Sequence, residues 1–419
     1  MKIILSLFLL PSVGLFDAVE AGWSRPQVGA ARMAWEGALL DESAGELSWF
    51  PSLTLTAQGS RQDSLENRST AIANFGGVPF EVDLGLGETS GSLSLALVYP
   101  LWTGGLANAQ FQLNKAAALG AQREWERTLR LAGLNGGLAW IDLWLATEAM
   151  ALSEQRVQTA TALFEDTVLQ VEAGRMSPFD QLRIESDLLG ARESLSVTEA
   201  DLLAARVRFS QATGWNVDEV VLGDLPLLPQ DVTFSPASNR LGPLVAQAHW
   251  SLTTLSLDLI KDRPSLTLST SASHPLNEQG FSTGDTLGTS LALSWPLLDA
   301  SEKRRLEAAR ARESSAKATW EQVLDEEAAF VATSLARLAT YPSRMEAANR
   351  RHTLALKAAE IASIGRTAGT LSFLDWKGAE DEALAAGLAR ATLVATWWRD
   401  WLSLSAGDPT PMETLLQRN

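Results

Sequence analysis

Four short stretches of the chain alternate apolar and polar residues with a period of two. In the first of them, Leu53 and Leu55 alternate with serine and threonine. Such alternation predicts strands with one buried face, and the intervening Gly/Ser/Asn/Asp-rich loops predict antiparallel hairpins. We expect strands at about 51–59, 91–99, 264–272 and 288–295.

Each predicted hairpin is followed by a change to helical composition. No proline interrupts the stretch from Gly105 to about Ala173, which as one helix would extend for about 100 Å. A second stretch runs from Ser301 towards Gly365, with Pro342 as its one interruption. Helices this long must bury their apolar stripes along neighbouring helices. We therefore expect two helical hairpins, at about 103–213 and 301–406.

The chain contains an internal duplication. "SLALVYPLW" at Ser94 recurs as "SLALSWPLL" at Ser290, an offset of 290 − 94 = 196 residues. "VEAGRMSPFD" recurs as "RTAGTLSFLD", with Gly174 and Gly369 separated by 369 − 174 = 195 residues. Nearly constant spacing predicts one structural unit present twice, at 22–225 and 226–408, followed by a tail at 409–419.

The N-terminus has the pattern of a secretory signal peptide. Lys2 precedes an apolar run, and small residues around Ala21 suit cleavage after that position, which predicts residues 1–21 as the signal. An exported chain without cysteine folds without disulfides and is not acylated at an N-terminal cysteine.

Charge and composition exclude several classes of function. The 34 basic and 50 acidic residues give a net charge of −16, which argues against nucleic acid as a partner. The three histidines are scattered and no ligand spacing predicts a metal site. No catalytic motif is present, so we expect neither an enzyme nor a cofactor.

The strands have the length needed to cross a bilayer. About nine alternating residues suit a tilted transmembrane strand. Aromatic residues flank the strands at what would be one end of the sheet, which predicts an interfacial girdle; the alternative is ordinary core packing at strand-to-helix corners. Four strands cannot close a sheet, so we expect oligomers with eight or twelve strands. The girdle residues would be Trp49, Phe50, Tyr99, Trp102 and Trp295.

The ordered, duplicated motifs resemble those of the TolC family of outer-membrane efflux proteins. The resemblance lies in "LALVYPLWTGG" and "LALSWPLLDAS" where strands give way to helices, in the two Ala-Gly bends, and in "SQATG" and "LSLSAG" at the helix ends. It covers about Gly22 to Gly407. It implies a mainly α-helical fold built of duplicated β-β-α-α units, in which a homotrimer forms a twelve-stranded transmembrane β-barrel and a periplasmic α-barrel.

The same resemblance implies an outer-membrane channel of a tripartite export system in a Gram-negative bacterium. Its partners would be outer-membrane lipid, a periplasmic adaptor (membrane fusion) protein and an inner-membrane transporter of the RND, ABC or a similar class. Cargo in the family includes drugs, metals, small toxins and unfolded polypeptides. The alternatives from other classes are a periplasmic adaptor and a structural coiled-coil or adhesin, neither of which accounts for two copies of strands and hairpin.

The resemblance places the candidate gate at the two bends. Asp180 and Asp375 match the tip aspartates of the family and would form carboxylate rings that favour cations; alternatively each caps the returning helix. Where the family often has an arginine, this chain has Leu371, with Arg366 nearby after Gly365. The remaining gate candidates are Gly174, Arg175, Met176 and Gly369.

Two further features have structural interpretations. Trp140 and the tryptophans at 397, 398 and 401 are expected to pack between helices rather than hold a ligand. Gly133, Gly136 and Gly137 would admit close approach of the segment from Trp215 to Asn239, or are tolerated weak points in the long helix.

Overall fold

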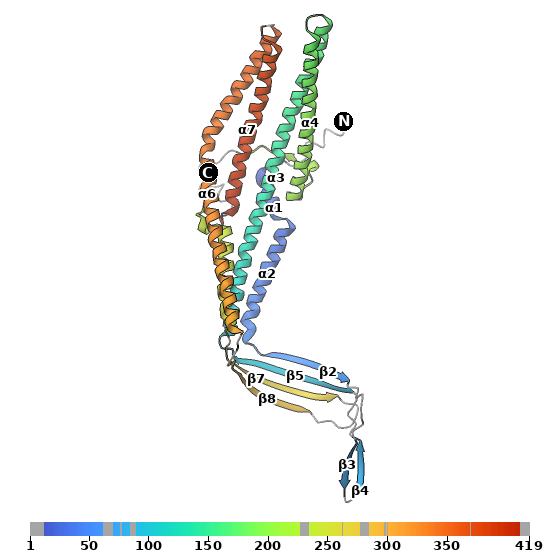
Figure 1. The fold of residues 1–419 in the computed structure, drawn as a ribbon, viewed down its shortest axis with the longest axis vertical. Helices are drawn as coiled ribbons and strands as arrows, with labels where there is room; N and C mark the ends of the chain where they lie inside the picture. The colour runs from blue at the N-terminus through green and yellow to red at the C-terminus, as the bar shows by residue number, and fades with distance from the viewer. Residues whose placement is uncertain are drawn as a thin grey trace. The chain divides into compact units, whose positions relative to one another are not determined.

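The computed structural model describes residues 12–61, 70–75, 78–83, 89–226, 234–261, 263–276, 285–296, 299, 301–368 and 370–410. Contacts divide the chain into two compact units. The first comprises Met1–Gly37, Leu119–Trp250 and Ala316–Asn419, and the second comprises Ala38–Ala118 and Ser251–Ser315. Figure 1 shows the labelled helices and strands.

The second unit contains the four predicted strands as one antiparallel sheet in the order β2-β5-β7-β8. Their bounds are β2 Ser52–Arg61, β5 Thr89–Trp102, β7 Ser265–Leu276 and β8 Thr286–Ser294. The predicted first loop also contains a hairpin that the sequence analysis did not anticipate, β3 (Thr70–Phe75) with β4 (Val78–Asp83), in a separate two-stranded sheet.

The sheet has one face on which leucines gather and one face rich in serine and threonine. The register places Leu55 opposite Leu95 and Leu268 opposite Leu291, so leucines from all four strands share a face. On the opposite face, Ser269 and Ser290 are joined by a 2.7 Å hydrogen bond between their side-chain oxygens. Among the described residues, leucines of the edge strands are largely exposed: 65% for Leu55 and 63% for Leu291.

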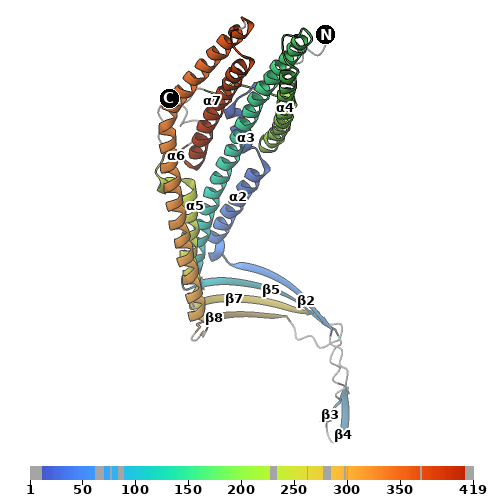
Figure 2. The ribbon, with the colours of Figure 1, turned by 45° about the horizontal axis from the view of Figure 1, so that its top comes forward.

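The first unit contains two helical hairpins that lie side by side (Figures 1 and 2). Hairpin 1 is α3 (Leu106–Glu172) with α4 (Pro178–Thr213), and hairpin 2 is α6 (Glu302–Thr367) with α7 (Phe373–Gly407). Shorter helices precede each pair of sheet strands, α2 (Pro26–Glu46) and α5 (Leu241–Ile260), and 3-10 turns lie at Leu47–Trp49, Val217–Glu219 and Ala237–Asn239.

Helical geometry continues through Pro342, which lies inside α6. None of the helices in the described part of the chain has a stretch that is both long and apolar enough to span a bilayer.

Each copy of the repeat has a stacked pair of tryptophans between its shorter helix and the long helix that follows. Trp35 on α2 stacks on Trp125 of α3 with ring centroids 5.0 Å apart, and Trp250 on α5 stacks on Trp320 of α6 at 5.2 Å. The shorter helix of each copy is therefore attached to the following long helix by the same aromatic contact, which supports the interpretation of the chain as a duplication.

The largest core of the first unit is rich in aromatic residues. Trp140, Trp398 and Trp401 are almost completely buried, and Phe16 meets Trp398 edge to face at 5.8 Å. The indole of Trp140 donates a 3.0 Å hydrogen bond to the carbonyl oxygen of Val13. These contacts confirm the predicted packing role of the tryptophans.

A short N-terminal helix packs on the glycine-rich part of α3. This helix is α1 (Leu15–Trp23). A Cβ atom at Gly136 of α3 would come within 2.2 Å of the carbonyl oxygen of Ala18 in α1. A Cβ atom at Gly22 of α1 would come within 2.3 Å of the carbonyl oxygen of Ala132 in α3. The glycines thus do admit a close neighbour. That neighbour is α1, whereas the sequence analysis had proposed the segment from Trp215 to Asn239.

The same packing involves residues of the predicted signal peptide, and cleavage after Ala21 stays a prediction. Leu15, Ala18 and Val19 are each at most 2% exposed. The preceding strand β1 (Ser12–Val13) pairs in parallel with β6 (Val221–Leu222). In this structure, β1 and most of α1 therefore cover part of the aromatic core. The apolar run from Ile3 to Leu10 lies outside the described residues.

We expect Gly136→Ala to lower the free energy of unfolding by about 1–3 kcal/mol, because the new methyl group would force α1 away from α3. Denaturant unfolding of the purified protein measures this change. Gly190→Ala on α4 is the matched control, since a Cβ there has no neighbour within 4 Å. That substitution should stabilise by about 0.5–1 kcal/mol. Equal effects of the two substitutions would contradict the close packing.

Candidate functional site

The first bend is a tight turn followed by a capped helix. Gly174 has φ = 71°, a left-handed conformation that glycine adopts without strain. Ser177 is the N-cap of α4: the backbone N–H of Asp180 donates to its Oγ at 3.2 Å, and that hydroxyl donates to the Asp180 carboxylate at 2.7 Å. The bend is thus fixed locally by a glycine and a Ser–Asp pair.

The second bend repeats this arrangement. Ser372 is the N-cap of α7 and accepts from the backbone N–H of Asp375 at 3.2 Å, while the Asp375 carboxylate accepts from the Ser372 hydroxyl at 2.5 Å. Leu371 packs against Gly365: a Cβ atom at Gly365 would come within 2.6 Å of Cδ1 of Leu371. Gly369 lies outside the described residues.

Both aspartates lie in the first turn of the returning helix, and the Asp375 carboxylate also accepts from the backbone N–H of Ser372 at 3.3 Å, which completes a capping box. Asp375 is exposed and Asp180 is half-buried. A carboxylate ring would need further copies of the chain, so the cation-selective role stays a prediction.

The other gate candidates are placed as follows. Arg175 is exposed and forms no ion pair among the described residues, whereas Met176 and Phe373 pack against a small core of Leu163, Ile184, Ala362 and Trp376.

An arginine connects the two hairpins close to the bends. Arg366 of α6 donates a 2.8 Å hydrogen bond to the carboxylate of Asp166 on α3, and its guanidinium lies 4.5 Å from the ring centre of Trp376. From the sequence, Arg366 was only an alternative to position 371 for the arginine that the family often has at this bend. Its partner was not predicted. Asp166 has no sequence signal, because the contact joins residues 200 positions apart.

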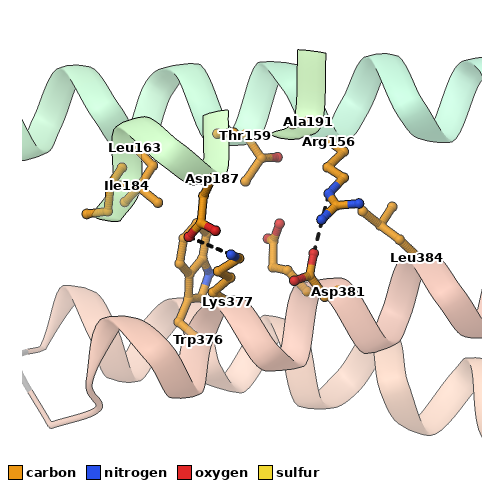
Figure 3. A pocket seen from close by; sticks show the side chains of 12 residues that line it. Arg156, Thr159, Leu163, Ile184, Asp187, Ala191, Trp376, Lys377, Asp381 and Leu384 are labelled. Atoms are coloured by element: carbon orange, nitrogen blue, oxygen red, sulfur yellow. Dashed lines mark ion pairs between the residues drawn. The ribbon is translucent and has the colours of Figure 1, made fainter. Parts of the chain in front are cut away.

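A small pocket lies between the hairpins (Figure 3). Its apolar part includes Leu163 and Ile184 of hairpin 1 and Trp376 of α7. Two ion pairs cross it: Lys377 Nζ lies 2.5 Å from Asp187 Oδ2, and Arg156 Nε lies 3.7 Å from Asp381 Oδ1. We call the zone formed by Arg156, Leu163, Asp166, Ile184, Asp187, Arg366, Trp376, Lys377, Glu380 and Asp381 the hairpin seam.

Glu380 lines the same pocket as a half-buried carboxyl group. Burial raises the pKa of Glu380, and the neighbouring charge of Asp381 raises it further, against the smaller opposing effects of Arg366 and a hydrogen bond with Thr159. The seam therefore favours the protonated form of this side chain.

The predicted girdle residues gather at one end of the sheet. Trp49 and Phe50 precede β2, whose first residue Ser52 pairs with Val98 near the end of β5. Tyr99 and Trp102 lie at that end of β5, and Trp295 follows β8, whose last residue pairs with the first of β7. All five are exposed, from 40% for Tyr99 to 66% for Phe50. Their membrane role stays a prediction.

Comparison with known proteins identifies the fold. No protein-family model and no curated protein sequence matches the chain. Among solved structures, the Campylobacter jejuni CmeC outer membrane channel is similar with a TM-score of 0.80 at 14% identity, over 96% of this chain and 88% of that one. The open-state Neisseria gonorrhoeae MtrE outer membrane channel gives 0.73 at 17% identity, over 94% and 88%.

The chain has the fold of these outer-membrane channels. The Vibrio cholerae outer membrane protein VceC shares it, with a TM-score of 0.76 at 16% identity over 94% of this chain and 96% of that one. The predicted TolC-like fold, a mainly helical chain with duplicated β-β-α-α units, is confirmed.

We expect Glu380→Gln to raise the midpoint of thermal unfolding at pH 7. A raised pKa in the folded state means that the contribution of Glu380 to stability is complete at low pH and is lost as pH rises through that pKa. The advantage of the glutamine variant should therefore disappear below about pH 4. Thermal scans from about pH 3 to pH 8 test this across the ordinary carboxyl range, with Glu185→Gln, an exposed position on α4, as the control. A variant no more stable than the parent at pH 7 would contradict it.

Proposed function

We propose that this chain is one subunit of an outer-membrane export channel and has no enzymatic activity. The observation that carries the proposal is the combination of a channel fold along nearly the whole chain with a sheet whose leucine face has no cover in the subunit. An uncovered apolar face of this extent needs a partner, and lipid is the partner that suits a face made of leucines and bordered by aromatic residues.

The opposite face of the sheet would then line an aqueous lumen. Its serine and threonine hydroxyls hydrogen-bond one another, as between Ser273 and Thr286 at 2.7 Å, and retain lone pairs for water. Alternation of leucine outside and hydroxyl inside is the pattern of a membrane-spanning strand around water.

Assembly follows from the open edges of the sheet. Among the described strands, β2 and β8 each have one edge without a partner, and such edges are not tolerated in lipid. Copies of the chain would pair β2 with β8 of a neighbour. A homotrimer would give a closed sheet of twelve strands, wide enough to enclose water. In this assembly the girdle residues would lie at the membrane interface.

The helical hairpins would extend into the periplasm of a Gram-negative cell. Their capped bends would meet a periplasmic adaptor and an inner-membrane transporter, which selects the cargo. Two hairpins, each following its own strands, favour a channel over the alternatives of a single-hairpin adaptor or a coiled-coil adhesin.

We expect the purified protein to run as an SDS-resistant, heat-sensitive trimer from the outer-membrane fraction and to conduct ions in planar bilayers. Leu291→Lys should destabilise the trimer by about 2–4 kcal/mol per subunit, because it would place a charge in lipid. Ser290→Lys, one position away on the hydroxyl face, is the matched control and should be tolerated. A soluble monomer, or equal sensitivity at positions 290 and 291, would refute the proposal.

The aspartates at the bends provide a second test, of the gate. We expect Asp180→Asn combined with Asp375→Asn to reduce cation selectivity of the channel, because asparagine keeps a capping side chain but removes the charge. Reversal potentials in a salt gradient measure selectivity. Values equal to those of the parent would assign both aspartates to helix capping alone.

A further inference from the structure

The two hairpins can be compared position by position across their bends. The N-caps Ser177 and Ser372 are separated by 372 − 177 = 195 residues. At the same offset, Arg156 corresponds to Arg351 (351 − 156 = 195), and Asp187 corresponds to Glu382 (382 − 187 = 195). Each hairpin therefore carries one arginine and one carboxylate at equivalent places.

In hairpin 2 these equivalent residues contact each other. Arg351 of α6 donates to Glu382 Oε1 of α7 from Nε at 3.0 Å and from Nη2 at 2.6 Å. The ion pair joins the two helices of one hairpin.

In hairpin 1 the corresponding residues have other partners. Arg156 is paired with Asp381, and Asp187 is paired with Lys377, so both bonds cross to hairpin 2 (Figure 3). Lys377 and Asp381 have no charged counterparts in hairpin 1, since the equivalent residues 195 positions earlier are Leu182 and Ser186. The charges that draw Arg156 and Asp187 across the seam are thus specific to α7.

Lys377 and Asp381 are four residues apart on α7, a spacing at which two side chains on a helix can pair. The four charges consequently have two complete sets of partners. One set is the observed pair of bonds across the seam. The other would join Arg156 to Asp187 within hairpin 1, as Arg351 joins Glu382, and Lys377 to Asp381 along α7.

We propose that these four residues exchange partners when the hairpins separate, so that the seam opens without leaving any of the four unpaired. Two ion pairs exist before the exchange and two after it. The cost of opening then lies in the apolar contacts of Trp376 with Leu163 and Ile184, and in the Arg366–Asp166 bond. As a gating device this exchange rests on the proposed channel function, because separation of the hairpins would widen the lumen.

The chain contains no cysteine, so labels can be introduced at chosen sites without a background. Spin labels at Gln158→Cys and Ala385→Cys, both exposed and on opposite sides of the seam, would report the inter-hairpin distance in the full-length protein. Labels at Gln158→Cys and Glu193→Cys, both in hairpin 1, serve as the control, and their distance should be the same in all variants. The quantity measured is the ratio of separated to closed populations.

Two double variants have opposite expected effects. Arg156→Gln with Asp187→Asn removes two ion pairs from the closed seam and one from the separated state, and should raise the separated population by about two- to fivefold. Arg156→Gln with Asp381→Asn removes one pair from the closed seam and two from the separated state, and should lower it by a similar factor. Both variants leave the net charge unchanged.

Without partner exchange, the second variant would also raise the separated population, and that result would overturn the proposal. So would the lack of any separated population in the first variant. Arg351→Gln with Glu382→Gln removes a pair that lies within hairpin 2 in both states, and should leave the ratio unchanged. These measurements do not depend on ion conduction, so absence of conductance would count against the channel function and leave the exchange standing.

Discussion

Lateral burial of two very long helices is the constraint on which the first unit depends. The 67-residue α3 and the 66-residue α6 have low overall hydrophobicity and cannot form cores of their own. Each is supported along its length by different neighbours. Near the bends the support is the returning helix, and farther along α3 it is α1, whose close approach depends on glycine at 133, 136 and 137. The tryptophans fill the wider spaces between helices, as Trp140 and Trp398 do.

The duplication gives the two hairpins the same local chemistry and leaves their mutual contact to differ. Both bends end in a Ser–Asp cap. The residues that join the hairpins are, by contrast, unique to one copy: Arg366, Trp376 and Lys377 correspond to Val171, Gln181 and Leu182. Duplication therefore supplied a stable bent hairpin twice, and divergence at a few positions supplied the contact between them. In a trimer, the same divergence would make the two hairpins of each subunit chemically different. A gate in which one hairpin moves against the other requires such a difference.

In the sheet of the second unit, by contrast, the local alternation of residues and the pairing of distant strands favour the same arrangement. Alternation with a period of two places leucine and hydroxyl residues on opposite faces whatever the partner strand. The register then aligns the four leucine sets, because a slip of one residue would mix the two faces. In the described part of the unit, exposed leucines and two strand edges without a partner are the features on which the proposed membrane assembly rests.

The sequence alone determined the features that repeat or that depend on local pattern. These are the four strands, the two hairpins, the bends and their caps, because periodicity, glycine and capping residues act over a few positions. Tertiary structure decided the rest. The neighbour of the glycines on α3 is one example, because the close approach of Ala18 to Gly136 joins residues more than a hundred positions apart. The residues that Asp166, Asp187 and Glu380 contact across the seam lie in other helices. No pattern within a single helix indicates which side chains of two helices will meet.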